Sequence, residues 1–221
     1  MNPLPLSAQL VDLLATSLLL LSFAMLAQRR VRTLVDLFAL QGMALALSTA
    51  LVAYSSGQHH LYASAVLTLL LKVLVLPMIL RRLISSLKVQ RDNEPLVNIP
   101  TTLLIGLALV IFAFGLAQPI SQLAHTVTRG TIGIAIAVVM LSFLMMITRR
   151  KAITQVLGFL AMENGLFFAA TSATYGMPMV VEFGIALDVL VGVFILGIFF
   201  FHIREQFDSL ELHHLESLKE E

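Results

Sequence analysis

The feature that most constrains this chain is a series of apolar runs, each about 20 residues long, separated by short polar or basic segments. A helix of about this length spans the ~30 Å hydrocarbon core of a bilayer. The chain is 58% hydrophobic and only 12% charged, whereas a soluble domain is about one quarter charged. The sequence therefore predicts an all-α polytopic membrane protein.

Hydropathy predicts about seven transmembrane helices. They cover residues 8–27, 34–54, 60–80, 101–119, 128–148, 153–173 and 180–202. Of the 14 basic residues, 12 lie in the segments that follow the first, third, fifth and seventh spans. Because Lys and Arg collect on the cytoplasmic side of membrane proteins, this bias predicts an N-terminus outside and a cytoplasmic C-terminus.

The two halves of the chain resemble each other. The matching windows are, in order, 21–30 with 141–150, 37–41 with 159–163, and 71–80 with 187–196. The first and last pairs agree at six of ten positions, and the middle pair agrees less well. Their common order predicts that spans one to three and five to seven are parallel copies joined by a linker helix. The alignment places Lys72 opposite Asp188 and Gln41 opposite Glu163.

This repeat predicts the division of the chain into four parts. Residues 1–92 form an N-terminal three-helix unit, residues 93–126 hold the linker helix, and residues 127–204 form a second three-helix unit. Residues 205–221 form a cytoplasmic tail that carries six acidic residues and an apolar side. Because helices that bind membrane surfaces are usually basic, the tail is more typical of a helix that docks on a soluble partner.

Two carboxylates, Glu163 and Asp188, lie in the middle of apolar runs. A charge at the centre of a bilayer costs about 2.5–3.5 kcal/mol on insertion scales, so it usually has a partner or a function. Asp188 lies four residues from both Gly184 and Gly192. Small residues at this spacing let another helix approach closely, so we expect the Asp188 carboxylate to face protein. We interpret both carboxylates as parts of a proton pathway.

Two further ionisable residues complete the predicted pathway. Lys72 is the intramembrane cation, and a buried Lys shifts its pKa readily, so it relays protons or neutralises Asp188. Glu182 lies near the outer end of the last span, where protons would be taken up. A static buried ion pair is the alternative interpretation of Lys72 and Asp188.

The chain contains no motif for other chemistry. It has no cysteine, which excludes disulfides and thiolate metal sites. Its six His residues have no carboxylates at metal-ligand spacing. We find no nucleophile constellation, phosphate loop or nucleotide fingerprint. The sequence therefore predicts no catalytic residue, cofactor or metal site.

The C-terminal half resembles the small K subunit of complex I and its relatives in cation antiporters. The similar residues are Arg149-Arg150-Lys151, Gly158, Met162-Glu163-Asn164, Asp188 and Gly192. The resemblance implies three helices, an Arg-Arg turn on the cytoplasmic side and two intramembrane acids in a proton pathway. Asp188 takes the place of the third-helix glutamate. The second-helix glutamate aligns with Leu160, and Glu163 lies one turn further along the same face.

The whole chain resembles the E component of membrane-bound nickel–iron hydrogenases of the hydrogenase-four and formate hydrogenlyase type. The resemblance implies a non-redox subunit of a complex I-like membrane arm in the bacterial inner membrane, coupled to proton translocation. Its partners would be antiporter-like and H-type membrane subunits, and the nickel–iron hydrogenase and iron–sulfur subunits. Two alternatives stay open: a stand-alone transporter with the same three-plus-one-plus-three topology, and a purely scaffolding subunit.

Overall fold

The chain folds into long helices. A computed structural model describes residues 6–86, 97–123 and 131–174, together with Gly184, Leu187, residues 190–192, Phe194 and Gly197. Every regular element within these residues is helical, which confirms the all-α prediction. The predicted span at 180–202 falls mostly outside the described residues, although each of the seven residues described there is helical.

Within the described residues, six helical stretches are long and apolar enough to cross a membrane. The elements are α1 (Leu6–Ala27), α2 (Val31–Ser56), α3 (His60–Thr68), the π-helical segment η1 (Leu69–Val75), α4 (Leu76–Ser86), α5 (Ile99–Leu123), α6 (Thr131–Thr148) and α7 (Ala152–Thr174). Helices α3, η1 and α4 follow one another without a break and form one span. The third predicted span is therefore real but ends later than residue 80. The protein is a multi-pass membrane protein.

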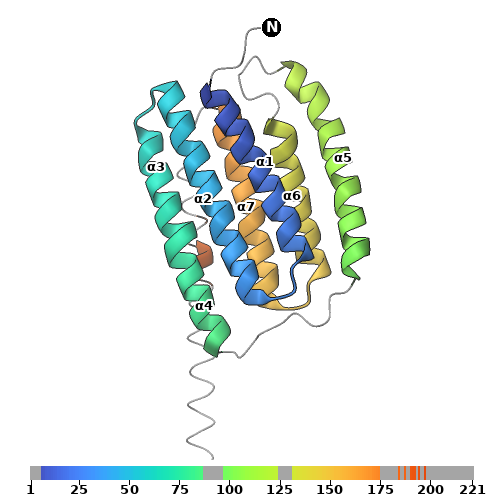
Figure 1. The fold of residues 1–221 in the computed structure, drawn as a ribbon. Helices are drawn as coiled ribbons and strands as arrows, with labels where there is room; N and C mark the ends of the chain where they lie inside the picture. Colours follow the sequence, from blue (N-terminus) through green and yellow to red (C-terminus); the bar gives the residue numbers. More distant parts are fainter. Residues whose placement is uncertain are drawn as a thin grey trace, which may run out of the picture.

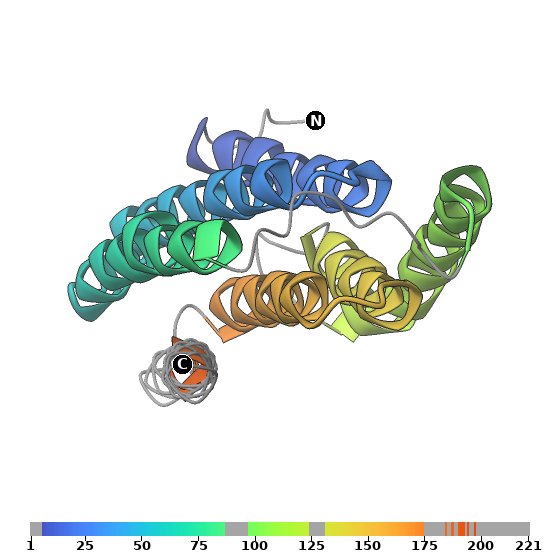
Figure 2. The same cartoon turned by 90° about the horizontal axis from the view of Figure 1, so that it is seen from below.

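The helices form two layers. One layer holds α1, α2 and the continuous α3–η1–α4 rod, and the other holds α5, α6 and α7 (Figures 1 and 2). Across the layers, α1 packs on α6 and α2 packs on α7. Helix α5 lies at one edge against α6 and α1 and is the least buried span. The first and second halves of the chain therefore meet face to face.

Local sequence explains where these helices end and change. Helix α2 stops at Gly57, which adopts the left-handed conformation (φ 68°) that only glycine takes up without cost. The π-helical turn of η1 lies just before Pro77. Pro77 has no N–H to donate to the carbonyl four residues earlier, and the N–H of Leu76 bonds to the carbonyl of Leu71, five residues earlier. The helix is therefore widened directly before the proline.

The interior contains two separate apolar clusters. The first holds Met25, Leu26, Val31, Leu34, Val35, Phe38, Leu76, Leu80, Leu83, Ile84, Leu141, Met145, Ile153, Leu157, Leu160, Ala161 and Val191. The second holds Val11, Ala15, Leu18, Ala44, Leu45, Val52, Ala53, Leu61, Ala135, Val138, Phe167 and Phe168. On α1, α2 and α7 the two sets of residues occupy opposite ends of the helix. A level near the middle of the bundle therefore belongs to neither cluster.

Candidate functional site: a buried polar layer

Polar side chains fill the level between the two apolar clusters. We call these residues the polar layer: Ser22 of α1, Gln41 of α2, Lys72 of η1, Ser142 of α6, and Glu163 and Asn164 of α7. All six are buried. All but Ser142 lie in sequence between residues of the first and second clusters on their own span, and Ser142 lies between Leu141 and Met145 of the first cluster. Polar groups removed from both water and lipid must find partners within the protein, so the contacts inside the layer decide its chemistry.

An ion pair lies at the centre of the polar layer. The Lys72 Nζ atom is 3.4 Å from Oε1 of Glu163, and the two side chains are only 1% and 4% exposed. Lys72 comes from the first half of the chain and Glu163 from the second. The sequence predicted both residues as intramembrane charges but offered Asp188 as the partner of Lys72. The structure brings Lys72 to Glu163, and because Asp188 lies outside the described residues its pairing with Lys72 stays a prediction.

The backbone around Lys72 is adapted to this pairing. Lys72 lies in the middle of η1, and short π-helical segments occur frequently at functional sites. A Cβ placed on Gly42 of α2 would lie only 2.9 Å from the Lys72 Cβ, so a glycine is needed for η1 to approach this closely. Helix α2 packs on both η1 and α7. Gly42 therefore lets the lysine stem pass α2 on its way to Glu163.

A chain of hydrogen bonds extends the polar layer to α1. Asn164 Nδ2 donates to Gln41 Oε1 at 3.1 Å, and Gln41 Nε2 donates to Ser22 Oγ at 2.9 Å. Ser22 in turn donates to the carbonyl of Leu18 at 2.9 Å. The first two bonds run from α7 to α2 and from α2 to α1. The Gln41 amide is held by both bonds. Because it accepts from Asn164 of the second half and donates to Ser22 of the first, it links the two halves of the chain.

Two predicted site residues, Asp188 and Glu182, lie outside the described residues, so their roles stay predictions. The described positions on either side of Asp188 do contact protein. A Cβ placed on Gly184 would lie 2.9 Å from the Phe167 ring, and one on Gly192 would lie 3.8 Å from Leu76. The close approach expected at Gly184 is therefore present.

The structure also reveals roles that the sequence did not predict. Arg149 was interpreted only as part of a basic cytoplasmic turn, yet its side chain is buried. Its Nη2 atom donates to the carbonyls of Leu26 and Gln28 at 3.0 and 2.6 Å, which are open acceptors at the end of α1. Gln41 and Asn164 lie in apolar runs at the same depth as the charges. Their common depth was the signal that could have identified the hydrogen-bonded layer.

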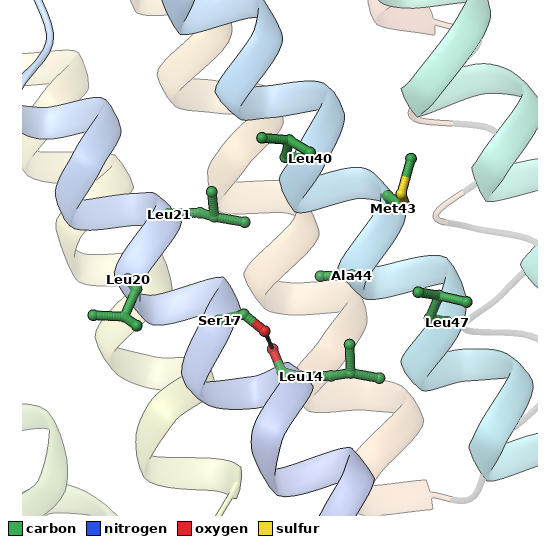
Figure 3. A pocket seen from close by; sticks show the side chains of 8 residues that line it. All are labelled: Leu14, Ser17, Leu20, Leu21, Leu40, Met43, Ala44 and Leu47. Carbon is green, nitrogen blue, oxygen red and sulfur yellow. Dashed lines mark hydrogen bonds between the residues drawn. The ribbon is translucent and has the colours of Figure 1, made fainter.

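Two other features lie outside the polar layer. Asp36 accepts a 2.6 Å bond from Arg81, and both side chains are exposed. On the outer surface of α1 and α2 a groove of about 400 Å³ is lined by Leu14, Ser17, Leu20, Leu21, Leu40, Met43, Ala44 and Leu47 (Figure 3). The Ser17 hydroxyl bonds to the carbonyls of Leu13 and Leu14. This groove therefore offers an apolar surface rather than a reactive group.

The chemistry available in the polar layer is proton exchange and charge stabilisation. The pair of Lys72 and Glu163 can exist as an ammonium and a carboxylate or, after one proton moves, as two neutral groups. Within the described residues no group of three or more His, Asp or Glu side chains is placed to hold a metal ion. The fixed amides of Gln41 and Asn164 support the pair but do not titrate.

Comparison with known proteins identifies relatives along the whole chain. The uncharacterized protein Rv0085 of Mycobacterium tuberculosis (strain ATCC 25618 / H37Rv) is 36% identical over 212 residues, which cover 96% of each chain. The chain belongs to the same family as this mycobacterial protein. It is also similar to Hydrogenase-4 component E of Escherichia coli (strain K12), at 21% identity over 96% of this chain and 98% of the relative. Hydrogenase-4 component E of Shigella flexneri is similar to the same extent.

No protein-family model matches the chain, and no solved structure matches it significantly.

Proposed function

We propose that this protein is a non-redox membrane subunit of a hydrogenase-like complex, and that its polar layer takes part in proton translocation. The similarity to Hydrogenase-4 component E supports the first part, because it extends over nearly the full length of both chains. The absence of cysteine agrees with redox centres being held by other subunits. The buried pair of Lys72 and Glu163 supports the second part.

The proposed partners follow from the same similarity. They are antiporter-like and H-type membrane subunits, and nickel–iron hydrogenase and iron–sulfur subunits on the cytoplasmic side. The proposed location is the bacterial inner membrane, with the basic turns facing the cytoplasm. In this setting the protein would carry charge changes through the membrane arm while electrons move in the other subunits.

The pair of Lys72 and Glu163 is the observation that carries the proposed mechanism. A proton that arrives at the Glu163 carboxylate neutralises it and removes its attraction for Lys72. A neutral side chain is free to turn away and pass the proton on, after which the pair forms again. Asp188 and Glu182 would continue this path, as the sequence predicts. Redox chemistry in the partner subunits would drive the change in charge.

The test compares two carboxylate variants in the native host. Glu163→Gln removes the titratable group from the polar layer with little change in shape, whereas Asp36→Asn removes an exposed carboxylate from the membrane edge. We expect Glu163→Gln to reduce hydrogen-linked proton movement in inverted membrane vesicles at least tenfold, and Asp36→Asn to leave it unchanged. Co-purification of the partner subunits with nickel and iron must be equal in both variants.

The possible outcomes separate the alternatives. Full proton movement in an assembled Glu163→Gln complex would contradict a proton role and leave a scaffolding subunit. A wild-type chain that purifies in mild detergent without any hydrogenase subunit would contradict the complex and favour a stand-alone transporter. A screen for transported substrates would then be the next measurement.

A further inference from the structure

Ser142 of α6, like Ser64 of α3, differs from the buried hydroxyl groups that bond back to their own helix. Within the described part of the chain its Oγ atom is buried and has no hydrogen-bond partner. Ser and Thr in helices usually bond back to the carbonyl four residues earlier. Ser22, Thr49 and Thr171 each do so. A buried hydroxyl that forgoes this bond keeps its donor available for another acceptor.

The packing of α1 on α2 shows how the residues at the aligned positions interact in the first half of the chain. The sequence alignment places Ser142 at the position of Ser22, and Glu163 at the position of Gln41. All four side chains are buried, as the alignment requires. In the first half the two aligned residues are bonded directly, because Gln41 Nε2 donates to Ser22 Oγ at 2.9 Å. The corresponding bond in the second half would join Ser142 to Glu163.

A matching detail further along the helices supports this correspondence. Thr49 lies eight residues after Gln41, and its hydroxyl bonds to the carbonyl of Leu45 at 2.9 Å. Thr171 lies eight residues after Glu163, and its hydroxyl bonds to the carbonyl of Phe167 at 3.0 Å. The two helices therefore share more than their pattern of burial.

The contacts between α6 and α7 put Ser142 at the right level. A Cβ placed on Gly158 would lie 3.3 Å from the Ser142 carbonyl oxygen, and one on Gly165 would lie 3.2 Å from the Val139 nitrogen. The α6 stretch from Val139 to Ser142 therefore faces the α7 stretch from Gly158 to Gly165. Glu163 lies inside that α7 stretch.

We infer that Ser142 is a positioning residue that holds the protonated Glu163 carboxyl group in a second state, apart from Lys72. A hydroxyl both donates and accepts hydrogen bonds. Ser22 accepts from the Gln41 amide, whereas Ser142 would donate its O–H to the carbonyl oxygen of the protonated Glu163. Once Glu163 is protonated, its contact with the Lys72 ammonium is replaced by one hydrogen bond to Ser142, and the proton stays on Glu163 in this step. Glu163 thus gains two alternative partners on different helices, which is what a switching element requires.

This inference rests on the proposed proton role of Glu163, so the test reads the carboxyl group directly. Infrared difference spectra of the assembled complex, recorded on a change of pH, would contain a carboxyl band that disappears in Glu163→Gln. We expect Ser142→Ala to shift this band to higher wavenumber, because it loses a hydrogen-bond donor, and Ser142→Thr to restore it. The same Ser142→Ala change should slow proton movement by up to about tenfold, as expected for the loss of one hydrogen bond.

Ser64 of α3 provides the matched control. Its hydroxyl is also buried without a hydrogen-bond partner in the described residues, but it lies outside the polar layer. We expect Ser64→Ala to leave the band and the rate of proton movement unchanged. A Glu163 band that does not move in Ser142→Ala would overturn the inference while leaving the proposed function standing. If the wild-type complex has no infrared band assignable to Glu163, the proposed proton role of Glu163 is contradicted, and the inference about Ser142, which rests on that role, is contradicted with it.

Discussion

The most direct consequence of the structure is that Lys72 and Glu163 should be energetically coupled. Their charged atoms lie 3.4 Å apart, and both side chains are almost completely buried. At an effective dielectric constant of about 20, two unit charges at this distance attract by about 5 kcal/mol. Removing one partner leaves the other charge buried and uncompensated, which costs about 3–5 kcal/mol in soluble proteins.

A double-mutant cycle measures this coupling. We expect Lys72→Met and Glu163→Gln each to lower the free energy of unfolding by about 3–5 kcal/mol. The double variant should be much closer to wild type, because it buries no uncompensated charge at this site, and the interaction energy should exceed about 2 kcal/mol. Unfolding in mixed micelles of SDS and a mild detergent can be followed with dyes on cysteines introduced at the α1–α2 and α6–α7 turns.

An exposed ion pair in the same protein supplies the control. Asp36 and Arg81 are only 2.6 Å apart, but both side chains are more than half exposed. Such pairs contribute about 0–1 kcal/mol, so a cycle on Asp36→Asn and Arg81→Met should give an interaction energy below about 1 kcal/mol. Single-variant effects that simply add at Lys72 and Glu163 would show that the close approach has no energetic consequence. The proposed switching of Glu163 would then lose its basis.

Three further predictions follow. Two concern residues that position the polar layer, and the third concerns the orientation of the protein in the membrane. Arg149→Ala should lower the free energy of unfolding by about 2–4 kcal/mol, because it removes two hydrogen bonds from a charged donor. The control is Arg150→Ala, which changes an exposed residue and should lower the free energy of unfolding by less than about 0.5 kcal/mol in the same assay. Gly42→Ala should cost about 1–3 kcal/mol through overpacking, whereas Gly115→Ala, which meets open space, should be neutral or slightly stabilising. A cysteine at Ser85 should react with an impermeant maleimide only after the cells are permeabilised, since the charge bias places this end of α4 in the cytoplasm; labelling in intact cells would reverse the predicted orientation.

The helical type and the approximate positions of the six described spans could be predicted from sequence because hydrocarbon thickness and hydropathy determine them. The six described spans lie close to their predicted positions, and the errors are at the ends. The third span continues to Ser86 rather than residue 80, and α5 begins at Ile99 rather than residue 101. Hydropathy falls at Arg81 and Arg82, but a helix continues beyond the bilayer core as long as its backbone bonds can form. Composition reports the membrane boundary and not the helix boundary.

The charged residues of the site could also be predicted, but their pairing could not. Lys72 and Glu163 are recognisable because ionisable residues are rare within apolar runs. Which carboxylate meets Lys72 depends on how the two halves dock and on the wider turn of η1, and neither is encoded in a local pattern. The burial of Arg149 is similar, since its acceptors lie more than 100 residues away in sequence. The alignment of the two halves pairs residues at corresponding positions, such as Lys72 and Asp188. Contacts between the two halves join residues at different positions, such as Lys72 and Glu163.

The predicted repeat gives a physical reason for the two halves to differ at this level. At aligned positions α2 carries Gln41 where α7 carries Glu163. Two identical copies would place two carboxylates, or two amides, at these positions, and neither arrangement would give the one carboxylate and one neutral amide that the polar layer contains. The layer is balanced only when both halves dock, so it favours one relative position of the halves whatever else it does. A merely static layer would be satisfied by this balance alone, and the Glu163 carboxyl band would then not respond to Ser142→Ala. The response of that band, compared with the response to Ser64→Ala, is therefore the measurement that separates a proton-handling layer from a structural one.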